Sequence, residues 1–434
     1  MWIFYELLLL LGFLLYLPKA LWRRRLPHRG WSMRLGRYPT DVTHALQGRN
    51  TLWVHAVSVG EVLSAKPLIQ ELIRRYPEQP LVLSTVTHSG FDVATKAVEG
   101  KGVPIYFPLD MRMAVTRALD AIRPRALLLM ESELWPMMIW LAKARDIPIA
   151  VVNGRISGRA FRRYGWIRPW LKGMLRRVDL FLMQSQIDAD RILALGAPAQ
   201  RVKVTGNSKW DASRGTRPTP TEITALASRL GLRQEDRVLV GGSTHRGEEQ
   251  VLLHAFQTLR STHPTLRLIV APRHLERLAE VEGLIRHAGF TPVRLLQATP
   301  STSWEVGVID TFGQLAQYYD LATVVFIGGS LIPHGGQNPL EAVSLGKPIV
   351  YGPSMDNFAA ISHQLLAHHA ARQIASAEEL TPLFKELLDH PVEAQAMGRR
   401  GQELTEQFCG ATQRILEALT PLLARHPTWP QGYG

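Results

Sequence analysis

From residue 51 onward, short apolar runs alternate with segments of helical period, such as Val62–Tyr76 and Leu134–Ala144. Apolar runs without polar alternation are typical of strands buried on both faces, and helices between such strands indicate a parallel sheet. The first domain is therefore predicted to be of the α/β class. Its predicted strands are Leu52–Val57, Leu81–Val86, Val103–Phe107, Ala126–Met130, Ile147–Val152, Leu180–Met183 and Val202–Thr205.

The segment Asp211–Thr221, with the sequence DASRGTRPTPT, interrupts this alternation. It is rich in Pro, Thr, Arg and Ser and has no apolar period, so we predict an interdomain linker at 211–221. The domains on either side cover 26–210 and 222–434. Because ligands of parallel sheets bind outside the carboxyl ends of the strands, the expected site is a cleft between the two domains.

The same alternation resumes after the linker and gives way to helices at the end of the chain. The predicted strands are Arg237–Val240, Leu266–Ala271, Pro292–Leu296, Val306–Ile309, Thr323–Ile327 and Pro348–Tyr351. The predicted helices are Glu248–Leu259, Glu276–His287, Pro339–Leu345 and Ala359–His369, followed by helical sequence over Ala377–Ala424 that we assign to the second domain.

The N-terminus, residues 1–25, has a different pattern. Trp2–Leu17 is almost wholly apolar, and Lys19 and Arg23–Arg25 follow it. A spanning helix needs about 20 apolar residues, so this run is short, but it lacks the basic start and cleavage site of a signal peptide. We predict an uncleaved anchor in the inner membrane, with the basic flank keeping the body of the chain cytoplasmic. A helix lying in the membrane interface or a buried core helix are the alternatives.

The charge balance points to an anionic partner. Lys and Arg number 50 against 37 Asp and Glu, which gives a net charge of +13. Such a surplus attracts nucleic acid, an anionic membrane or a phosphorylated substrate. No nucleic-acid-binding motif occurs, and the predicted anchor directs the charge to the membrane. The single cysteine, Cys409, excludes an internal disulfide framework and a cysteine-based zinc site.

Acidic residues follow two of the predicted strands. Glu61 comes after Leu52–Val57 and the turn at Gly60, and Glu131 directly follows Ala126–Met130. If both face one pocket, one carboxylate could act as a base while the other shapes the field around it. Alternatively, Glu61 only complements a helix dipole. For Ser132 and Glu133, we favour capping of the next helix.

Glycine-rich segments follow two strands of the second domain. Val240–Glu248 combines a glycine turn, hydroxyl groups and a helix start, and Gly328–Glu341 has the same character. Free backbone amides at such turns suit a phosphate, although the first segment is not a Walker loop. Arg273 follows a third strand and could bind a phosphate or carboxylate. Taken singly, each glycine turn is also compatible with an ordinary connection.

Two further sequence patterns have a structural explanation as well as a functional one. Asp188 and Asp190 form the D-x-D pattern of many metal-dependent sugar transferases, but here they more simply open a short helix, and no histidine spacing predicts a metal site. The stretch Arg162–Lys172, with Arg176 and Arg177, mixes cations and aromatic rings. It fits a solvated helix face or a surface that meets anionic lipid headgroups.

Taken together, these segments resemble the Kdo transferases, the 3-deoxy-D-manno-octulosonic acid (Kdo) transferases of Gram-negative envelopes, in order over nearly the whole chain. The matching segments are His55–Glu61, Glu131–Pro136, Val152–Ser157, Gly206–Asp211, Gly242–Glu249, Ala271–His274, Asp310–Gly313, Gly328–Ser330 and Gly335–Glu341. Two departures from the family pattern are Gln337, where a His is common, and Phe312 with Gln314, which replace the usual Met and Glu.

The resemblance implies a GT-B fold with two facing Rossmann-like domains, an acceptor site in the first, a nucleotide-sugar site in the second and a short N-terminal membrane anchor. It also implies an inverting, metal-independent transfer of Kdo from CMP-Kdo to an anionic glycolipid, the lipid A precursor lipid IVA, in lipopolysaccharide core synthesis. CMP-Kdo is a donor substrate, and no cofactor is expected.

The resemblance also implies roles for individual residues. Glu61 matches the general base, and Glu131 and Lys209 match residues that stabilise the transition state. Glu341 matches a ribose partner. The positions that match the CMP contacts are Pro272, Arg273, Thr311, Phe312, Gly313, Gly335, Gly336, Gln337 and Asn338.

Two other functions fit the sequence less well. One is a membrane-tethered transferase that uses a diphosphate nucleotide sugar. The other is a basic, membrane-bound nucleotide sensor without catalytic chemistry. The paired strand-end acids argue against the sensor, because a protein that only binds nucleotide has no need of Glu61 at the site.

Overall fold

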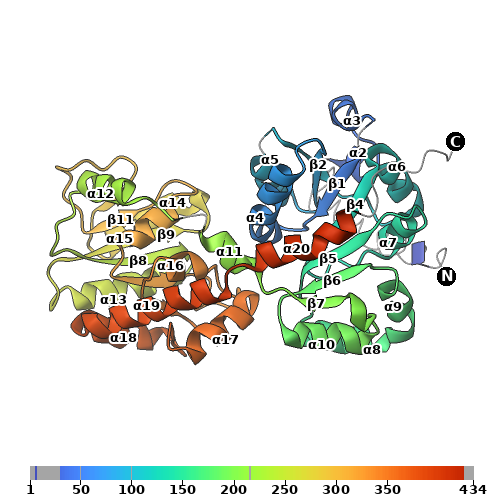
Figure 1. The fold of residues 1–434 in the computed structure, drawn as a ribbon. Helices are drawn as coiled ribbons and strands as arrows, with labels where there is room; N and C mark the ends of the chain where they lie inside the picture. The colour runs from blue at the N-terminus through green and yellow to red at the C-terminus, as the bar shows by residue number, and fades with distance from the viewer. Residues whose placement is uncertain (1–4, 7–29, 49, 99, 215–216, 425–434) are drawn as a thin grey trace. The chain divides into compact units, whose positions relative to one another are not determined.

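The computed structural model describes residues 5–6, 30–48, 50–98, 100–214 and 217–424 (Figure 1). The chain divides into two compact units. Unit 1 comprises Met1–Ala212 together with Cys409–Gly434, and unit 2 comprises Ser213–Phe408.

Unit 1 is built on a seven-stranded sheet with the order β3-β2-β1-β4-β5-β6-β7, in which every pair of neighbours is parallel. The predicted parallel sheet is therefore confirmed. The strands are β1 (Thr51–His55), β2 (Leu81–Thr85), β3 (Gly102–Tyr106), β4 (Pro124–Met130), β5 (Ile149–Gly154), β6 (Leu180–Met183) and β7 (Val202–Val204).

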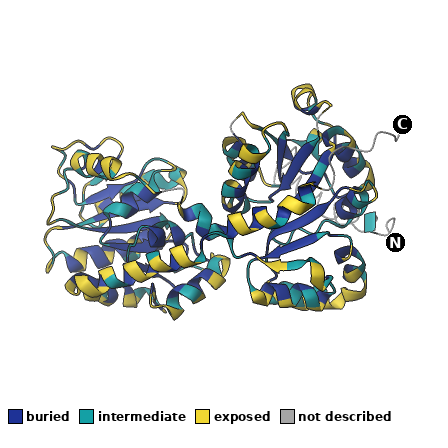
Figure 2. Ribbon diagram, viewed as in Figure 1, coloured by how far each residue is buried: buried dark blue, intermediate teal, exposed yellow. Residues whose placement is uncertain are grey.

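Both faces of this sheet are covered by helices, so its central strands are buried throughout (Figure 2). Along β1, Trp53 packs into one core cluster, whereas Leu52 and Val54 pack into the other. This alternation explains why the middle of the strand, Leu52–Val54, is apolar on both faces. The helices are α2 (Trp31–Arg34), α3 (Thr40–Leu46), α4 (Val59–Arg75), α5 (His88–Val98), α6 (Arg112–Ile122), α7 (Pro136–Lys143), α8 (Gly158–Trp166), α9 (Arg168–Leu175), α10 (Gln186–Leu195), the 3-10 helix η1 (Ala199–Arg201), α11 (Ser208–Arg214) and α20 (Ala411–Ala424).

The last helix, α20, belongs to unit 1, whereas the sequence placed all terminal helices in the second domain. Its apolar side chains Ile415 and Leu419 complete the core cluster that contains α4. The Asp211 carboxylate accepts hydrogen bonds from the N–H groups of Gly410 and Thr412, at 2.6 and 2.5 Å. These two amides belong to the start of α20, so Asp211 holds that end of the helix to unit 1.

Unit 2 contains a second parallel seven-stranded sheet with the order β10-β11-β9-β8-β12-β13-β14. Its strands are β8 (Arg237–Thr244), β9 (Leu266–Pro272), β10 (Pro292–Arg294), β11 (Val306–Val308), β12 (Val324–Ile327), β13 (Ile349–Tyr351) and β14 (Arg372–Gln373). Its helices are α12 (Pro220–Arg229), α13 (Glu248–Leu259), η2 (Leu275–Arg277), α14 (Leu278–His287), α15 (Leu315–Leu321), α16 (Leu340–Ser344), η3 (Asp356–Phe358), α17 (Ala359–Ala367), η4 (Ala377–Glu379), α18 (Leu380–Asp389) and α19 (Pro391–Phe408).

The strand β8 is longer than predicted, because Gly241 and Gly242 continue it and do not form a turn. A Cβ atom on Gly242 would lie 1.8 Å from the hydroxyl oxygen of Tyr319. The glycine is therefore needed for the close packing of β8 against Tyr319 of α15. The first glycine-rich segment thus turns only after Thr244.

The ends of the predicted linker also differ from the structure. Residues Ser208–Arg214 form α11 and Pro220 begins α12, so helices enter the segment 211–221 from both sides. Thr219 and Glu222 form a capping box at the start of α12.

The predicted anchor, Trp2–Leu17, lies outside the described residues except for Tyr5 and Glu6. The Tyr5 hydroxyl donates to the Asp110 carboxylate at 2.7 Å, and the Glu6 carboxylate accepts from the Arg112 amide at 2.6 Å. Within the described part of the chain, no helix combines the length and apolar character needed to cross a bilayer.

Candidate active site

Glu61 and Glu131 lie at the point of unit 1 where the strand order reverses. Glu61 belongs to α4, which follows β1, and Glu131 directly follows β4. The strands β1 and β4 are paired neighbours, so both acids lie at one edge of the sheet, as predicted. In open α/β sheets this switch point is where ligands bind.

The Glu61 carboxylate is held at the start of α4. It accepts hydrogen bonds from the Val57 N–H at 2.8 Å and from the Ser58 hydroxyl at 3.3 Å. Burial, and then the negative charge of Glu131, raise the pKa of Glu61 to about 8 despite these bonds. Glu61 also lies in the first turn of α4, where a carboxylate complements the helix dipole. A pKa near neutrality is what a general base requires.

Glu131 forms an ion pair with Lys209. The Lys209 ammonium nitrogen lies 3.4 Å from a Glu131 carboxylate oxygen, and both side chains are 19% exposed. Glu131 has a φ of 53°, a left-handed conformation that is uncommon for a residue with a side chain. Its N–H donates to the Val152 carbonyl at 2.9 Å, which holds the strained residue against β5. Such strain is typical of functional positions.

Glu133 is a third carboxylate at this site, and the expectation that it caps the next helix is wrong. The helix α7 begins at Pro136 without a side-chain cap. Ser132, assigned the same role, donates instead to the Arg155 carbonyl. Burial and the charge of Glu131 raise the pKa of Glu133 to about 7. Glu133 also contributes to the raised pKa of Glu61, so the three acids form one electrostatic group.

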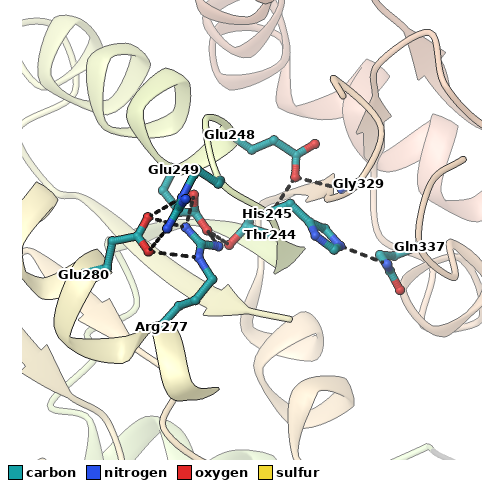
Figure 3. Close-up of polar contacts among 9 residues, drawn as sticks. Thr244, His245, Glu248, Glu249, Arg277, Glu280, Gly329 and Gln337 are labelled. Atoms are coloured by element: carbon teal, nitrogen blue, oxygen red, sulfur yellow. Dashed lines mark hydrogen bonds and ion pairs between the residues drawn. The ribbon is translucent and has the colours of Figure 1, made fainter. Parts of the chain in front are cut away.

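In unit 2, the loops that follow β8 and β12 meet around the buried Glu248 carboxylate (Figure 3). Its oxygens accept hydrogen bonds from the N–H groups of His245, Gly329, Ser330 and Leu331, at distances of 2.7 to 3.0 Å. The sequence suggested that these amides were free for a phosphate. They are occupied by Glu248, so a phosphate must be bound by other groups.

The neighbouring acid, Glu249, is equally buried and faces a different partner. Arg277 donates to its two carboxylate oxygens at 2.8 and 3.2 Å, and the Thr244 hydroxyl donates to it at 3.0 Å (Figure 3). Arg277 also donates to Glu280 at 3.1 Å. This ion-pair network joins α13 to η2 and fixes the segment that follows Arg273.

The predicted CMP contacts lie along the same edge of the second sheet. Pro272 ends β9, and the Arg273 N–H donates to the Thr244 carbonyl at 2.9 Å, while the Arg273 residue as a whole is exposed. Asn338 donates to the Glu341 carboxylate at 3.1 Å. Burial raises the pKa of Glu341, whereas Asn338 and Arg273 lower it. Arg273, a predicted phosphate contact, thus lies close enough to act on Glu341, the predicted ribose partner.

The remaining predicted contacts lie in two exposed or glycine-rich turns. Phe312 is 68% exposed, and Gly313 has a positive φ. Gly335 and Gly336 both have positive φ values, 94° and 74°, which favour glycine. Thr311 donates to Gln314 at 3.2 Å, and the Gln337 side chain contacts His245 at 3.1 Å. The assignment of these residues to CMP stays a prediction.

The D-x-D pattern has a structural role. Asp188 is buried and accepts hydrogen bonds from the Ile156 N–H at 2.8 Å and the Ser185 hydroxyl at 2.5 Å, next to the N-cap of α10. Within the described ranges, no group of three or more His, Cys, Asp or Glu residues is placed to hold a metal ion.

Two parallel α/β units with a candidate site at each switch point define a two-domain protein of the GT-B type. In agreement with this class, the fold resembles that of UDP-GlcNAc 2-epimerase from Neisseria meningitidis, solved with UDP-GlcNAc bound. The TM-score is 0.60 at 15% sequence identity, over 86% of this chain and all of the other. This likeness shows the fold alone.

Sequence relatives identify the family. A family model described as 3-deoxy-D-manno-octulosonic-acid transferase (kdotransferase) matches residues 29–212. The 3-deoxy-D-manno-octulosonic acid transferase of Haemophilus influenzae is 33% identical over 86% of this chain and 88% of its own length. The enzyme of the same name from Bordetella pertussis is 32% identical over 85% and 86%. The chain belongs to the Kdo transferase family of glycosyltransferases, as the sequence motifs indicated.

Proposed function

We propose that the protein transfers Kdo from CMP-Kdo to the lipid A precursor lipid IVA, with inversion at the anomeric carbon and release of CMP. The observation that carries this proposal is that the paired strands β1 and β4 bring Glu61 to the same sheet edge as the Glu131–Lys209 ion pair. We infer that the transferred sugar is Kdo because the chain belongs to the Kdo transferase family.

The reaction is a single displacement. An acceptor hydroxyl oxygen attacks the anomeric carbon of Kdo and forms the new glycosidic bond. The bond from that carbon to the phosphate oxygen breaks, and its electron pair leaves with CMP. The hydroxyl proton passes to the Glu61 carboxylate, and charge on the departing phosphate is stabilised by cationic groups such as Lys209 and Arg273.

A single displacement, assisted by one base and without a covalent intermediate, inverts the configuration at the anomeric carbon. Retention would need a second displacement, for which one of the other carboxylates would have to attack the sugar. Glu131 is engaged with Lys209, which supports a role in the field around the reaction and not as a nucleophile. The anomeric configuration of the product, read by NMR, distinguishes the two mechanisms.

The donor needs no metal in this scheme. CMP-Kdo carries one phosphate, whose charge cationic side chains such as Arg273 can balance. Activity should therefore persist in EDTA after thorough dialysis. Loss of activity that magnesium restores would contradict metal independence.

The acceptor is an anionic glycolipid, so the enzyme must work at a membrane surface. We place it on the cytoplasmic face of the inner membrane, held by Trp2–Leu17. The exposed face of α8 and the start of α9 would add to this attachment. Trp166 is 89% exposed there, Arg162, Arg163 and Arg168 are exposed beside it, and none of the residues of α8 is buried. An exposed Trp among cations is typical of a surface that meets anionic lipid.

The decisive experiment is mass spectrometry of lipid IVA after incubation with CMP-Kdo and the purified full chain. A mass increase of one or more Kdo units, with equimolar CMP, is the expected result. If the glycolipid stays unchanged while a diphosphate nucleotide sugar is consumed, the proposed donor is wrong. If neither donor is consumed although CMP binds, the protein is a sensor and not a transferase.

A further inference from the structure

Three histidines gather at the functional edge of unit 2. His245 follows β8, His274 follows β9, and His334 lies in the segment between β12 and α16. The centroid of the His245 ring is 4.2 Å from that of His334 and 5.8 Å from that of His274. The Gln337 side chain lies 3.1 Å from Nε2 of His245 (Figure 3). Three separate loops thus bring imidazoles to one place.

The main charged groups that act on His245 are cationic. After burial, the groups that lower the pKa of His245 to about 4 are His334, His274, Arg273 and Arg277. None of these leading contributions from the described residues comes from an acid. These charges disfavour the protonated form of His245, so near neutral pH its ring is neutral and has one N–H to donate to an anion beside the arginines.

The acids near this cluster are engaged elsewhere. Glu248 is surrounded by backbone N–H groups, and Glu249 is bound by Arg277 and Thr244. Glu276 is the remaining candidate, but it is 78% exposed and its carboxylate lies 3.8 Å from His274. His274 and His334 are themselves exposed, so a ligand can reach them. Among the described residues, the cluster is not arranged as a metal site.

We propose that His245, His274 and His334 bind the carboxylate of the donor sugar, and that they select a donor with an acidic sugar. This inference rests on the proposed function. In CMP-Kdo, the anomeric carbon carries both the phosphate oxygen and the carboxylate, so the two anions are adjacent. In the protein, Arg273, a predicted phosphate contact, is likewise next to His274, because the two residues are consecutive in the sequence. A nucleoside diphosphate sugar has no carboxylate at that carbon and would leave the three imidazoles without an anionic partner.

The test compares two ligands that differ in the carboxylate. One is CMP-Kdo, measured by its KM. The other is the carboxyl methyl ester of CMP-Kdo, which keeps the sugar but has no free carboxylate, measured by its Ki as a competitor of CMP-Kdo. The variants are His274→Ala and His334→Ala, singly and together, in the full-length chain. The matched control is His287→Ala, an exposed histidine at the far end of α14 from the cluster.

Loss of a hydrogen bond to a charged group should raise the KM for CMP-Kdo roughly tenfold or more. The Ki of the methyl ester should stay within about twofold, because it lacks the carboxylate, and the control should match the wild type. Equal increases in KM and Ki would overturn the inference, since the histidines would then support the nucleotide or its loop. An unchanged KM would overturn it as well. The proposed function fails separately, if the wild-type chain transfers no Kdo.

Discussion

A carboxylate oxygen of Glu248 accepts a hydrogen bond from the backbone N–H of Gly329 at 2.7 Å. Through this contact the first residue of α13 is bound to the loop after β12, which lies 81 residues further along the chain. The approach of the loop is close, because a Cβ on Gly328 would lie 2.3 Å from the Ser243 carbonyl oxygen. Glu248 therefore positions the loop that leads to the predicted CMP contacts.

Replacement of this acid is expected to weaken both the fold and donor binding. In Glu248→Gln, one of the two oxygens becomes an NH₂ group, so some of the four amides lose their acceptor. Each buried donor left without a partner costs about 1–3 kcal/mol, and we expect a lower free energy of unfolding by at least that amount. The KM for CMP-Kdo should rise more than kcat falls. Urea unfolding and steady-state kinetics test this, with Glu406→Gln, an exposed acid on α19, as the control. Wild-type stability of Glu248→Gln would show that the amides do not depend on Glu248.

Removal of the proposed base should slow the reaction without weakening donor binding. Glu61→Gln keeps the size of the side chain and the oxygen that can accept from Val57, but it cannot take a proton. Turnover should fall by roughly 10²–10⁴-fold, the usual contribution of general base catalysis. The affinity for CMP, measured calorimetrically, should barely change. Near-normal turnover in this variant would exclude Glu61 as the base.

The same variant should become more stable than the wild type as the pH rises. In the folded chain the pKa of Glu61 is raised from 4.5 to about 8. Between these values the folded state holds a proton that the unfolded chain has released, so this carboxyl group lowers stability as the pH increases. The neutral amide introduced by Glu61→Gln has no such dependence. The Tm of Glu61→Gln minus that of the wild type should therefore increase between about pH 5 and pH 8; a difference that is constant with pH would contradict the raised pKa.

Glu133 offers a separate test of the electrostatics around Glu61. Because the base must be ionised, kcat should rise with pH to a plateau above about pH 8. Glu133 contributes to the raised pKa of Glu61, so Glu133→Gln should move this rise to lower pH. Glu78→Gln, an exposed acid just after α4, should leave the profile unchanged. An unshifted profile in Glu133→Gln would place the carboxylates too far apart to interact.

The sequence predicted the sheets and the position of both strand-end acids well, because both follow from local patterns. Apolar runs marked the strands, and an acid after a strand is placed by the parallel topology itself. The role of Glu133 could not be found in this way. Its pKa depends on burial and on Glu131, and both come from tertiary packing. Its spacing before α7 resembled a cap, which is the commoner use of such a residue.

Long-range contacts also explain the differences in unit 2 and at the end of the chain. Nothing in the local sequence shows that Glu248 accepts hydrogen bonds from backbone amides 81 to 83 residues away. The glycine turns therefore resembled phosphate sites with free amides. Similarly, the helical period of α20 predicts a helix but not the sheet on which it packs. That assignment depends on Asp211 and on the core around Ile415.

The exposed surface of α8 and α9 gives the last prediction, which concerns membrane attachment. Each Arg near an anionic lipid surface contributes about 1 kcal/mol, so Arg163→Gln in the full chain should weaken binding to phosphatidylglycerol-containing vesicles about fivefold. Arg399→Gln, an exposed arginine on α19, is the control.

Salt separates this surface from the N-terminal anchor. Attraction between exposed charges is screened over about 8–10 Å, so the difference between Arg163→Gln and the wild type should shrink at high salt. Trp166→Ser should instead weaken the salt-resistant part of binding, because an apolar ring inserted among the headgroups is not screened. The contrary result would be that both variants, the control and the wild type bind vesicles equally at low salt. The α8–α9 surface would then not meet the membrane, and attachment would rest on Trp2–Leu17.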